Sequence, residues 1–226
     1  MVSGNSLTQQ LIDYVNDNNI DFYEKIDLQN FKHLARLIGL EQGADIDIIY
    51  PFIKDLDTVV ELGSGYGRAL KFLLQKGYAG HLIGVERSQK LLKLLNGKFA
   101  QQAEILHQDL KQLQLTCQPD AILWLWSGVL ELSKSEQLES IKRFHALLRK
   151  DGLLILETPY KQIHKVGQKI HGKHLEFVTD WGKIDAYYTD EEEVEEYFKV
   201  CHFSEMHTVT YQTSTGYSRI FYILKK

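Results

Sequence analysis

The stretch V-V-E-L-G-S-G-Y-G-R, from Val59 to Arg68, decides the fold of this chain. A β-branched apolar run leads through the acidic residue Glu61 into a glycine-rich segment. Glycine then occupies every second position, at Gly63, Gly65 and Gly67. Because glycine has no Cβ, the backbone can turn sharply and approach a ligand closely. The stretch therefore predicts a strand, a tight turn and a helix start, the arrangement that holds a nucleotide-like ligand above a parallel sheet.

The spacing of the glycines separates this loop from a dinucleotide-binding fingerprint. The fingerprint G-x-G-x-x-G needs a third small residue where its helix packs closely on the strand. This chain has the spacing G-x-G-x-G, and Arg68 stands at the third position. An oxidoreductase that uses a nicotinamide dinucleotide is therefore disfavoured. It remains the first alternative, and a cofactor-binding assay distinguishes it.

Four further apolar runs follow at helix-sized intervals and predict the remaining parallel strands. They are residues 81–86, 103–110, 120–126 and 153–159. The first two end near acids, Glu86 and Asp109, and a doubly wound nucleotide site uses an acid after its second strand to bind the ribose. The alternating segments 206–212 and 218–224 predict a C-terminal antiparallel hairpin.

Taken together, these motifs resemble those of the class I S-adenosylmethionine-dependent methyltransferases, from about Leu56 to the C-terminus. The resemblance implies an α/β fold: a doubly wound, seven-stranded, mostly parallel sheet with a C-terminal antiparallel hairpin and an N-terminal helical cap. We expect the cap over residues 1–55 and the methyltransferase domain over residues 56–226. An insertion on the acceptor side is expected at residues 160–189.

The resemblance also implies which residues bind S-adenosylmethionine. Glu61 and the glycines would hold the methionine end, with N–H groups of the following helix start facing its carboxylate. Glu86 would bind the ribose, Asp109 the adenine amino group, and Leu110 would lie against the ring. The complete set of expected cofactor contacts is Glu61, Gly63, Gly65, Gly67, Arg68, Glu86, Arg87, Asp109, Leu110 and Trp126.

Two of these residues have open alternatives. Arg68 would pair with the methionine carboxylate or with an anionic acceptor, unless it is a solvated helix residue. Trp126 would contact the sulfonium or stack on the adenine, unless it packs in the core. The tetrapeptide W-L-W-S, Trp124 to Ser127, lacks the N-P-P-Y-like pattern typical of methyltransferases acting on exocyclic or amide nitrogens. That subclass is disfavoured, and we expect transfer to O or N of a small molecule.

Residues 161–174 contain four lysines, three histidines and no acid. They follow the fifth strand, where the carboxyl ends of a doubly wound sheet open to ligands. We expect an acceptor with a carboxylate or phosphate, attracted by three lysines on one helical face: Lys161, Lys165 and Lys169. His164 would act as the general base, and Tyr160 would position the same group. A solvated lid, whose lysines only keep it soluble, is the alternative.

Acidic residues gather in two other places. Residues 185–196 contain seven acids and no base, and Thr189 or Asp190 is expected to cap a helix there. The N-terminal region is also acid-rich, and its acids, which include Asp45 and Asp47, are expected on a solvated face.

Composition limits the other function classes. The formal net charge is −4, whereas nucleic-acid enzymes normally show a basic excess. The two cysteines form no metal motif, and no apolar run is long enough to span a bilayer. No secretion signal is visible, so we expect a cytoplasmic protein that acts on a small molecule without metal, nucleic acid or membrane. The oligomeric state stays open. A non-catalytic binding protein with the same fold is the second alternative.

Overall fold

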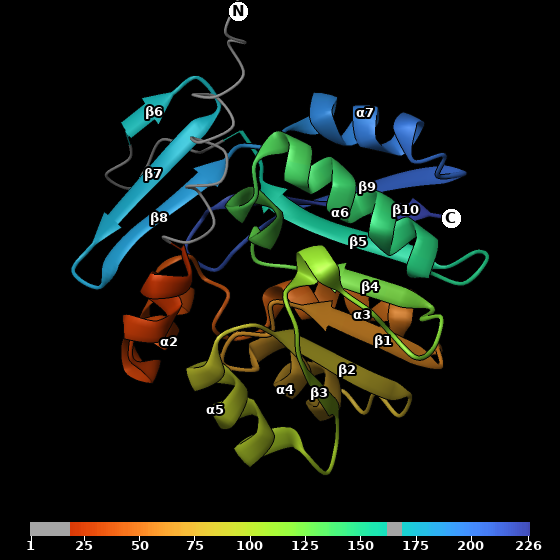
Figure 1. Cartoon of the computed structure of the whole chain (residues 1–226), viewed down its shortest axis with the longest axis horizontal. Coiled ribbons are helices and arrows are strands. Elements are labelled where there is room, and N and C mark those ends of the chain that lie inside the picture. Colours follow the sequence, from red (N-terminus) through yellow and green to blue (C-terminus); the bar gives the residue numbers. More distant parts are fainter. Residues whose placement is uncertain (1–18, 162–168) are drawn as a thin grey trace, which may run out of the picture.

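The computed structural model describes residues 19–161 and 169–226 of the chain (Figure 1). Seven strands form one sheet in the order β3-β2-β1-β4-β5-β10-β9. They are β1 (Thr58–Leu62), β2 (His81–Glu86), β3 (Glu104–His107), β4 (Ala121–Trp124), β5 (Leu153–Pro159), β9 (Glu205–Gln212) and β10 (Ser218–Lys225). Neighbours from β3 to β5 pair in parallel, and β10 is antiparallel to both β5 and β9. The predicted mostly parallel sheet with a C-terminal hairpin is confirmed.

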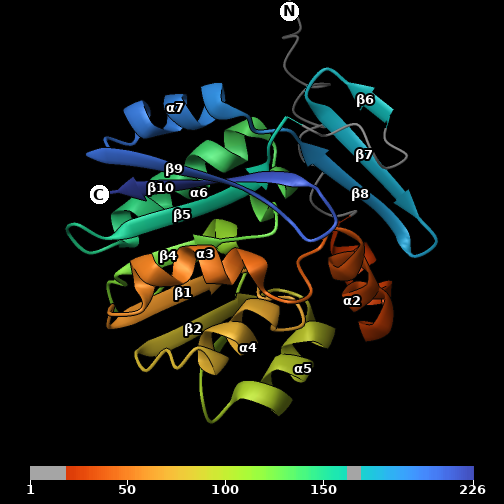
Figure 2. The ribbon, with the colours of Figure 1, turned by 180° about the vertical axis from the view of Figure 1, so that it is seen from behind.

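Helices cover both faces of this sheet (Figures 1 and 2). One face carries α3 (Ala44–Ile53), α4 (Arg68–Gln75) and α5 (Gln89–Phe99), and the other carries α6 (Lys134–Leu147) and α7 (Glu191–Val200). Because successive strand residues point to opposite faces, Val59 of β1 packs with α3 and α4, whereas Val60 packs with α6. In the described part of the chain, no helix has the length and apolar character needed to cross a bilayer.

The third and fourth strands are shorter than the sequence pattern predicts. β3 ends at His107, and the Asp109 side chain accepts a hydrogen bond of 2.8 Å from a following backbone amide to begin the short turn Leu110–Gln112. β4 ends at Trp124, which is buried in the core. Trp126 therefore lies beyond the strand.

Two helical segments precede α3 and form the N-terminal cap. Residues 19–25 are helical, and α2 (Leu28–Leu37) begins at Asp27, whose side chain accepts a hydrogen bond from the Asn30 amide. α2 lies at the end of the sheet where the parallel strands finish (Figure 2). The cap is thus placed over the carboxyl ends of the strands, where ligands bind in this architecture.

The segment after β5 contains a second, antiparallel sheet of three strands: β6 (Lys169–His171), β7 (His174–Thr179) and β8 (Gly182–Tyr187). Lys169 begins a strand, so the expectation that Lys161, Lys165 and Lys169 share one helical face is wrong at Lys169. Helical spacing does not apply in a strand, where side chains alternate between two faces. Lys165 lies outside the described residues.

The second sheet is joined to the N-terminal cap and to α7. The side-chain amide of Asn19 exchanges two hydrogen bonds of 2.9 Å with the backbone of Asp185 in β8. Lys173 pairs with Asp190 at 2.8 Å and with Glu193 at 2.5 Å. Asp190 and Glu193 form the capping box that begins α7, so the predicted cap is confirmed. The basic and the acidic segments therefore neutralise each other in part.

Candidate functional site

The glycine-rich loop between β1 and α4 has a backbone conformation that favours glycine. The angle φ is +62° at Gly63, +56° at Gly65 and +81° at Gly67. A Cβ on Gly67 would lie 2.3 Å from the ring of Phe99, whereas a Cβ on Gly63 would meet no atom within 4 Å. Gly67 therefore allows α4 and α5 to pack closely, and Gly63 faces open space above the sheet.

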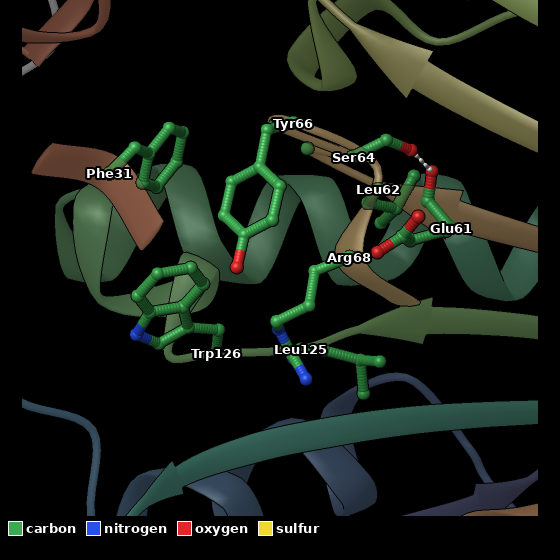
Figure 3. A pocket seen from close by; sticks show the side chains of 10 residues that line it. Phe31, Glu61, Leu62, Ser64, Tyr66, Arg68, Leu125 and Trp126 are labelled. Carbon is green, nitrogen blue, oxygen red and sulfur yellow. Dashed lines mark hydrogen bonds between the residues drawn. The ribbon is translucent and has the colours of Figure 1, made fainter. Parts of the chain in front are cut away.

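Glu61 lies in β1, and its carboxyl group faces a cavity beside the glycine loop (Figure 3). The residue is 5% exposed, and Oε2 has no hydrogen-bond partner among the described residues. Burial raises the pKa of Glu61 to about 8. Leaving a buried acceptor unsatisfied costs about 1–3 kcal/mol. The position therefore suits a ligand that donates hydrogen bonds, such as an ammonium group.

Glu86, at the end of β2, contacts the same loop. Its Oε2 accepts a hydrogen bond from the Gly65 N–H at 2.8 Å, and Oε1 accepts one from the Ser88 N–H at 2.7 Å. Burial raises the pKa of Glu86. A carboxylate has about four acceptor sites. The backbone N–H groups of Gly65, Ser88 and Arg87 use part of this capacity, and the rest is left for the predicted ribose contact.

Arg68 is buried and is not the solvated helix residue that the sequence left open. Its Nη1 donates to Asp45 at 2.7 Å and to the Leu40 carbonyl at 2.9 Å, and Nη2 donates to Asp45 at 2.5 Å. The expectation of a solvated acidic face is therefore wrong for Asp45, which is fully buried, whereas Asp47 is exposed. The Arg68 guanidinium also lies over Trp126, 5.6 Å from its ring centre.

Trp126 and Ser127 form a turn after β4 in which both residues are left-handed, with φ of +48° and +62°. This conformation costs roughly 1–2 kcal/mol per non-glycine residue and persists where neighbours hold it. Glu157 of β5 accepts the Trp126 N–H at 2.5 Å, and Arg219 of β10 donates to Ser127 Oγ at 2.7 Å. Arg219 and Tyr211 both donate to Glu157 as well. A buried ion pair thus fixes the turn.

Three aromatic side chains from separate elements meet at the cavity (Figure 3). The ring of Phe31, from α2, lies 5.0 Å from that of Tyr66 and 5.5 Å from that of Trp126. The Tyr66 hydroxyl has no partner among the described residues, and burial raises its pKa to about 12. The cavity is therefore apolar on the side of the cap and polar on the side of the glycine loop.

The residues expected near the adenosine lie at the ends of β2 and β3. Arg87 Nη1 is 3.9 Å from Asp109 Oδ2. Leu110 packs against the apolar cluster on the sheet face that α6 and α7 cover. The three residues are close together, and their contacts with a cofactor remain predictions.

Of the two catalytic candidates, one can be placed. Tyr160 follows β5, its amide donates to the Ser218 carbonyl at 2.9 Å, and the Lys161 ammonium lies 4.7 Å from its ring centre. His164 lies outside the described residues. Both assignments remain predictions.

Several residues of the site were missed from sequence. Tyr66 stands inside the glycine motif, so its position was a usable signal. The sequence carries no such signal for Asp45, Glu157 or Arg219, because each pairs with a residue far away in the chain.

Comparisons with known proteins agree with this geometry. Residues 59–152 match the family model of the methyltransferase domain. The carboxy-S-adenosyl-L-methionine synthase of Nautilia profundicola is 27% identical over 128 residues, which are 54% of this chain and 54% of that protein. The match thus spans about half of the length of this curated relative.

Solved structures show the fold over most of the chain. A S-adenosylmethionine-bound amino pentose methyltransferase from Micromonospora echinaspora has a TM-score of 0.68 at 17% identity, covering 89% of this chain and 98% of that one. The 1,6-didemethyltoxoflavin-N1-methyltransferase of Burkholderia thailandensis has a TM-score of 0.68 at 13% identity, covering 100% and 93%. Fold, site and family model define a class I methyltransferase domain. Residues 59–152 are thus similar to the methyltransferase domain family, and the chain shares the fold of S-adenosylmethionine-dependent methyltransferases.

Proposed function

We propose that this protein binds S-adenosylmethionine and transfers its methyl group to O or N of a small molecule. The observation that carries the proposal is the unpartnered, buried Oε2 of Glu61 beside the left-handed glycine loop. A carboxylate there suits the ammonium of a methionine group, and the open space at Gly63 suits close approach of its backbone-like end.

The remaining cofactor contacts follow from the ends of the neighbouring strands. Glu86 accepts hydrogen bonds from ribose hydroxyls, using acceptor capacity that its backbone partners leave. Asp109 accepts one from the adenine amino group, and Leu110 covers the ring. Arg87 and Trp126 complete the contacts, with Trp126 near the sulfonium.

Bound S-adenosylmethionine supplies an electrophilic methyl group on a positively charged sulfur. The protein then has to align a nucleophile with that methyl, which lowers barriers by up to about 7–11 kcal/mol in the best model systems. His164 takes the proton that an acceptor hydroxyl or amine releases, and Tyr160 orients the acceptor.

The acceptor is proposed to be anionic, and one of the four lysines in residues 161–174 does not contribute to its attraction. Lys173 is paired with Asp190 and Glu193, so its charge is already neutralised. The proposed attraction therefore rests on the other three lysines of this segment, Lys161, Lys165 and Lys169. Small-molecule acceptors are supported by two neighbours in structure, which act on an amino pentose and on didemethyltoxoflavin. A reducing, cytoplasmic setting fits the free thiols of Cys117 and Cys201.

Calorimetry tests the cofactor assignment. S-adenosylmethionine and S-adenosylhomocysteine should bind to the wild type, and NAD should not. Glu86→Ala should weaken both by about tenfold to a hundredfold, because charge-assisted hydrogen bonds are worth roughly 1.5–3 kcal/mol. Absence of binding, or binding of NAD instead, refutes the proposal. Binding without transfer to any acceptor favours a non-catalytic binding protein.

Once an acceptor is found, three variants test the acceptor side. His164→Ala should lower turnover while cofactor affinity stays intact. Charge reversal at Lys161 or Lys165 should raise the acceptor KM in a salt-dependent way. If all three variants behave like the wild type, residues 161–174 form only a solvated lid and His164 is not the general base.

A further inference from the structure

Among the described residues, the two sheets end in four edge strands, and three of these edges are protected against pairing with another chain. Edge strands carry unpaired backbone N–H and C=O groups, which natural proteins protect by shortening, covering or charging the strand. β3 and β6 have only four and three residues. In β8, the side-chain amide of Asn19 already occupies the N–H and the C=O of Asp185, with hydrogen bonds of 2.9 Å. The fourth edge strand is β9.

β9 is the last strand of the large sheet, and β10 is its only strand partner within the described part of the chain (Figure 2). It has eight residues with neither lysine nor proline, and it pairs with β10 along its whole length without a bulge. Helix α7 packs on one face of the sheet through Val194 and Tyr197. It leaves the far part of β9 uncovered, where Thr208, Thr210 and Gln212 are exposed. The long edge of β9 therefore has none of the usual protections.

The side chains of β9 favour pairing with an identical strand. Glu205 is the only Asp, Glu, Lys or Arg in the strand, and it pairs with Lys225 of β10 at 2.8 Å. The centre, from Thr208 to Thr210, is β-branched, which suits a strand. In an antiparallel pair centred on Val209, the two Glu205 residues would lie about 27 Å apart along the strands, because each residue adds about 3.4 Å. Like charges therefore do not oppose each other.

Exposed apolar side chains flank the first residues of β9 on both faces of the sheet. Four large apolar side chains are exposed among the described residues, and two of them are Phe52 of α3 and Val200 at the end of α7. The Phe52 ring lies 6.0 Å from the ring of His207 in β9, and α7 leads directly into the strand. Because α3 and α7 cover opposite faces, a strand added at this edge would approach apolar side chains on both sides.

We propose that β9 pairs in antiparallel orientation with β9 of a second copy of this chain, about a two-fold axis, so that the two large sheets become continuous. A two-fold axis brings the same strand against itself, so one self-complementary edge serves both copies. Addition of a strand supplies main-chain hydrogen bonds along the edge. Tyr211 of β9 donates to Glu157, which also accepts the Trp126 N–H, so the interface lies on a strand that supports the site. This inference does not depend on the proposed function.

Sedimentation equilibrium over about a hundredfold range of concentration tests the proposal. The wild type should form a species of twice the 26.2 kDa chain mass. Thr208→Lys should weaken the dimer at least tenfold, because it places two like charges beside the two-fold axis. Amide hydrogen exchange of the wild type gives a measurement that needs no variant. The amides of β9 should exchange more slowly at high than at low protein concentration, whereas those of β5 should not change.

The matched control is Thr116→Lys, the same substitution at an exposed residue between β3 and β4. It should dimerise like the wild type, and urea unfolding should show that both variants are folded. The proposal is overturned if Thr208→Lys dimerises as tightly as the control, or if a dimer forms without concentration-dependent protection of β9. A wild type that stays monomeric at every concentration also overturns it, and would leave the edge to a strand of another protein.

Discussion

Arg68 and Asp45 form a buried, two-pronged ion pair that joins the end of the glycine loop to helix α3. The two terminal nitrogens of Arg68 lie 2.7 Å and 2.5 Å from the two carboxylate oxygens, and the side chains are 5% and 0% exposed. Parallel N–H···O bonds of this kind fix orientation as well as distance. The loop expected to bind the cofactor and the helix α3 are thus held in one relative position.

Asp45→Asn should destabilise the protein by about 3–5 kcal/mol, because it leaves the Arg68 charge buried and uncompensated. The control is Asp47→Asn on the same helix, where the pair with Lys76 is largely exposed and worth at most about 1 kcal/mol. Urea unfolding of both variants measures the difference. Equal losses would show that Asp45 does not carry the charge balance of Arg68.

Alanine substitutions at two loop glycines should separate stability from binding. Gly67→Ala places a Cβ 2.3 Å from the Phe99 ring in addition to backbone strain, so it should cost about 2–5 kcal/mol of stability. Gly63→Ala meets no atom within 4 Å and should cost only about 1–2 kcal/mol of strain.

Gly63→Ala should weaken cofactor binding strongly although it costs little stability. Its added methyl group points into open space, where the proposed cofactor lies, so affinity should fall at least tenfold although the fold is kept. Denaturant unfolding and calorimetry on the same samples check both quantities. Tight binding by Gly63→Ala would place the cofactor elsewhere.

Stability should depend on pH through Glu61. Its pKa is raised from 4.5 to about 8 in the folded protein, so the folded state binds the proton more tightly than the unfolded state. The resulting stabilisation is fully present below pH 4.5 and is lost as pH rises through about 8. Its size is on the order of 2–5 kcal/mol.

Glu61→Gln removes this titration and keeps the shape of the side chain. The difference in unfolding free energy between wild type and variant should therefore change in favour of the variant between pH 5 and pH 8. Urea unfolding at several pH values measures it. Parallel pH curves for the two proteins would contradict the assignment.

Glu157→Gln should destabilise the protein by about 3–5 kcal/mol and alter the near-ultraviolet circular dichroism of the tryptophans. The charge of Arg219 would lose its buried partner, and the Trp126 N–H would no longer face a charged carboxylate. Tyr211→Phe is the control, because it removes one hydrogen bond to Glu157 and should cost about 1–3 kcal/mol with the turn intact. If Glu157→Gln were as stable as the control, the turn at Trp126 would not depend on the ion pair between Glu157 and Arg219.

The elements that sequence reasoning placed best are those encoded by local pattern. β2 and β5 match their predicted residues, and the C-terminal hairpin follows from alternating apolar residues. Local chemistry also predicted that Thr189 or Asp190 caps α7, and Asp190 is the cap. The segment after β5 was misjudged at Lys169, because its lysine spacing fits a helix whereas β6 is decided by pairing with β7.

The chain by itself determined the order of strands and helices, the glycine loop and the two acids at the ends of β1 and β2, since each depends on residues close together in sequence. Tertiary structure alone decided which charges are buried. Asp45 resembles its exposed neighbour Asp47 in sequence, and only the packing of α3 against the loop brings it to Arg68. The left-handed turn at Trp126 depends in the same way on Glu157 and Arg219, because charge pairing across the sheet requires that the strands already lie side by side.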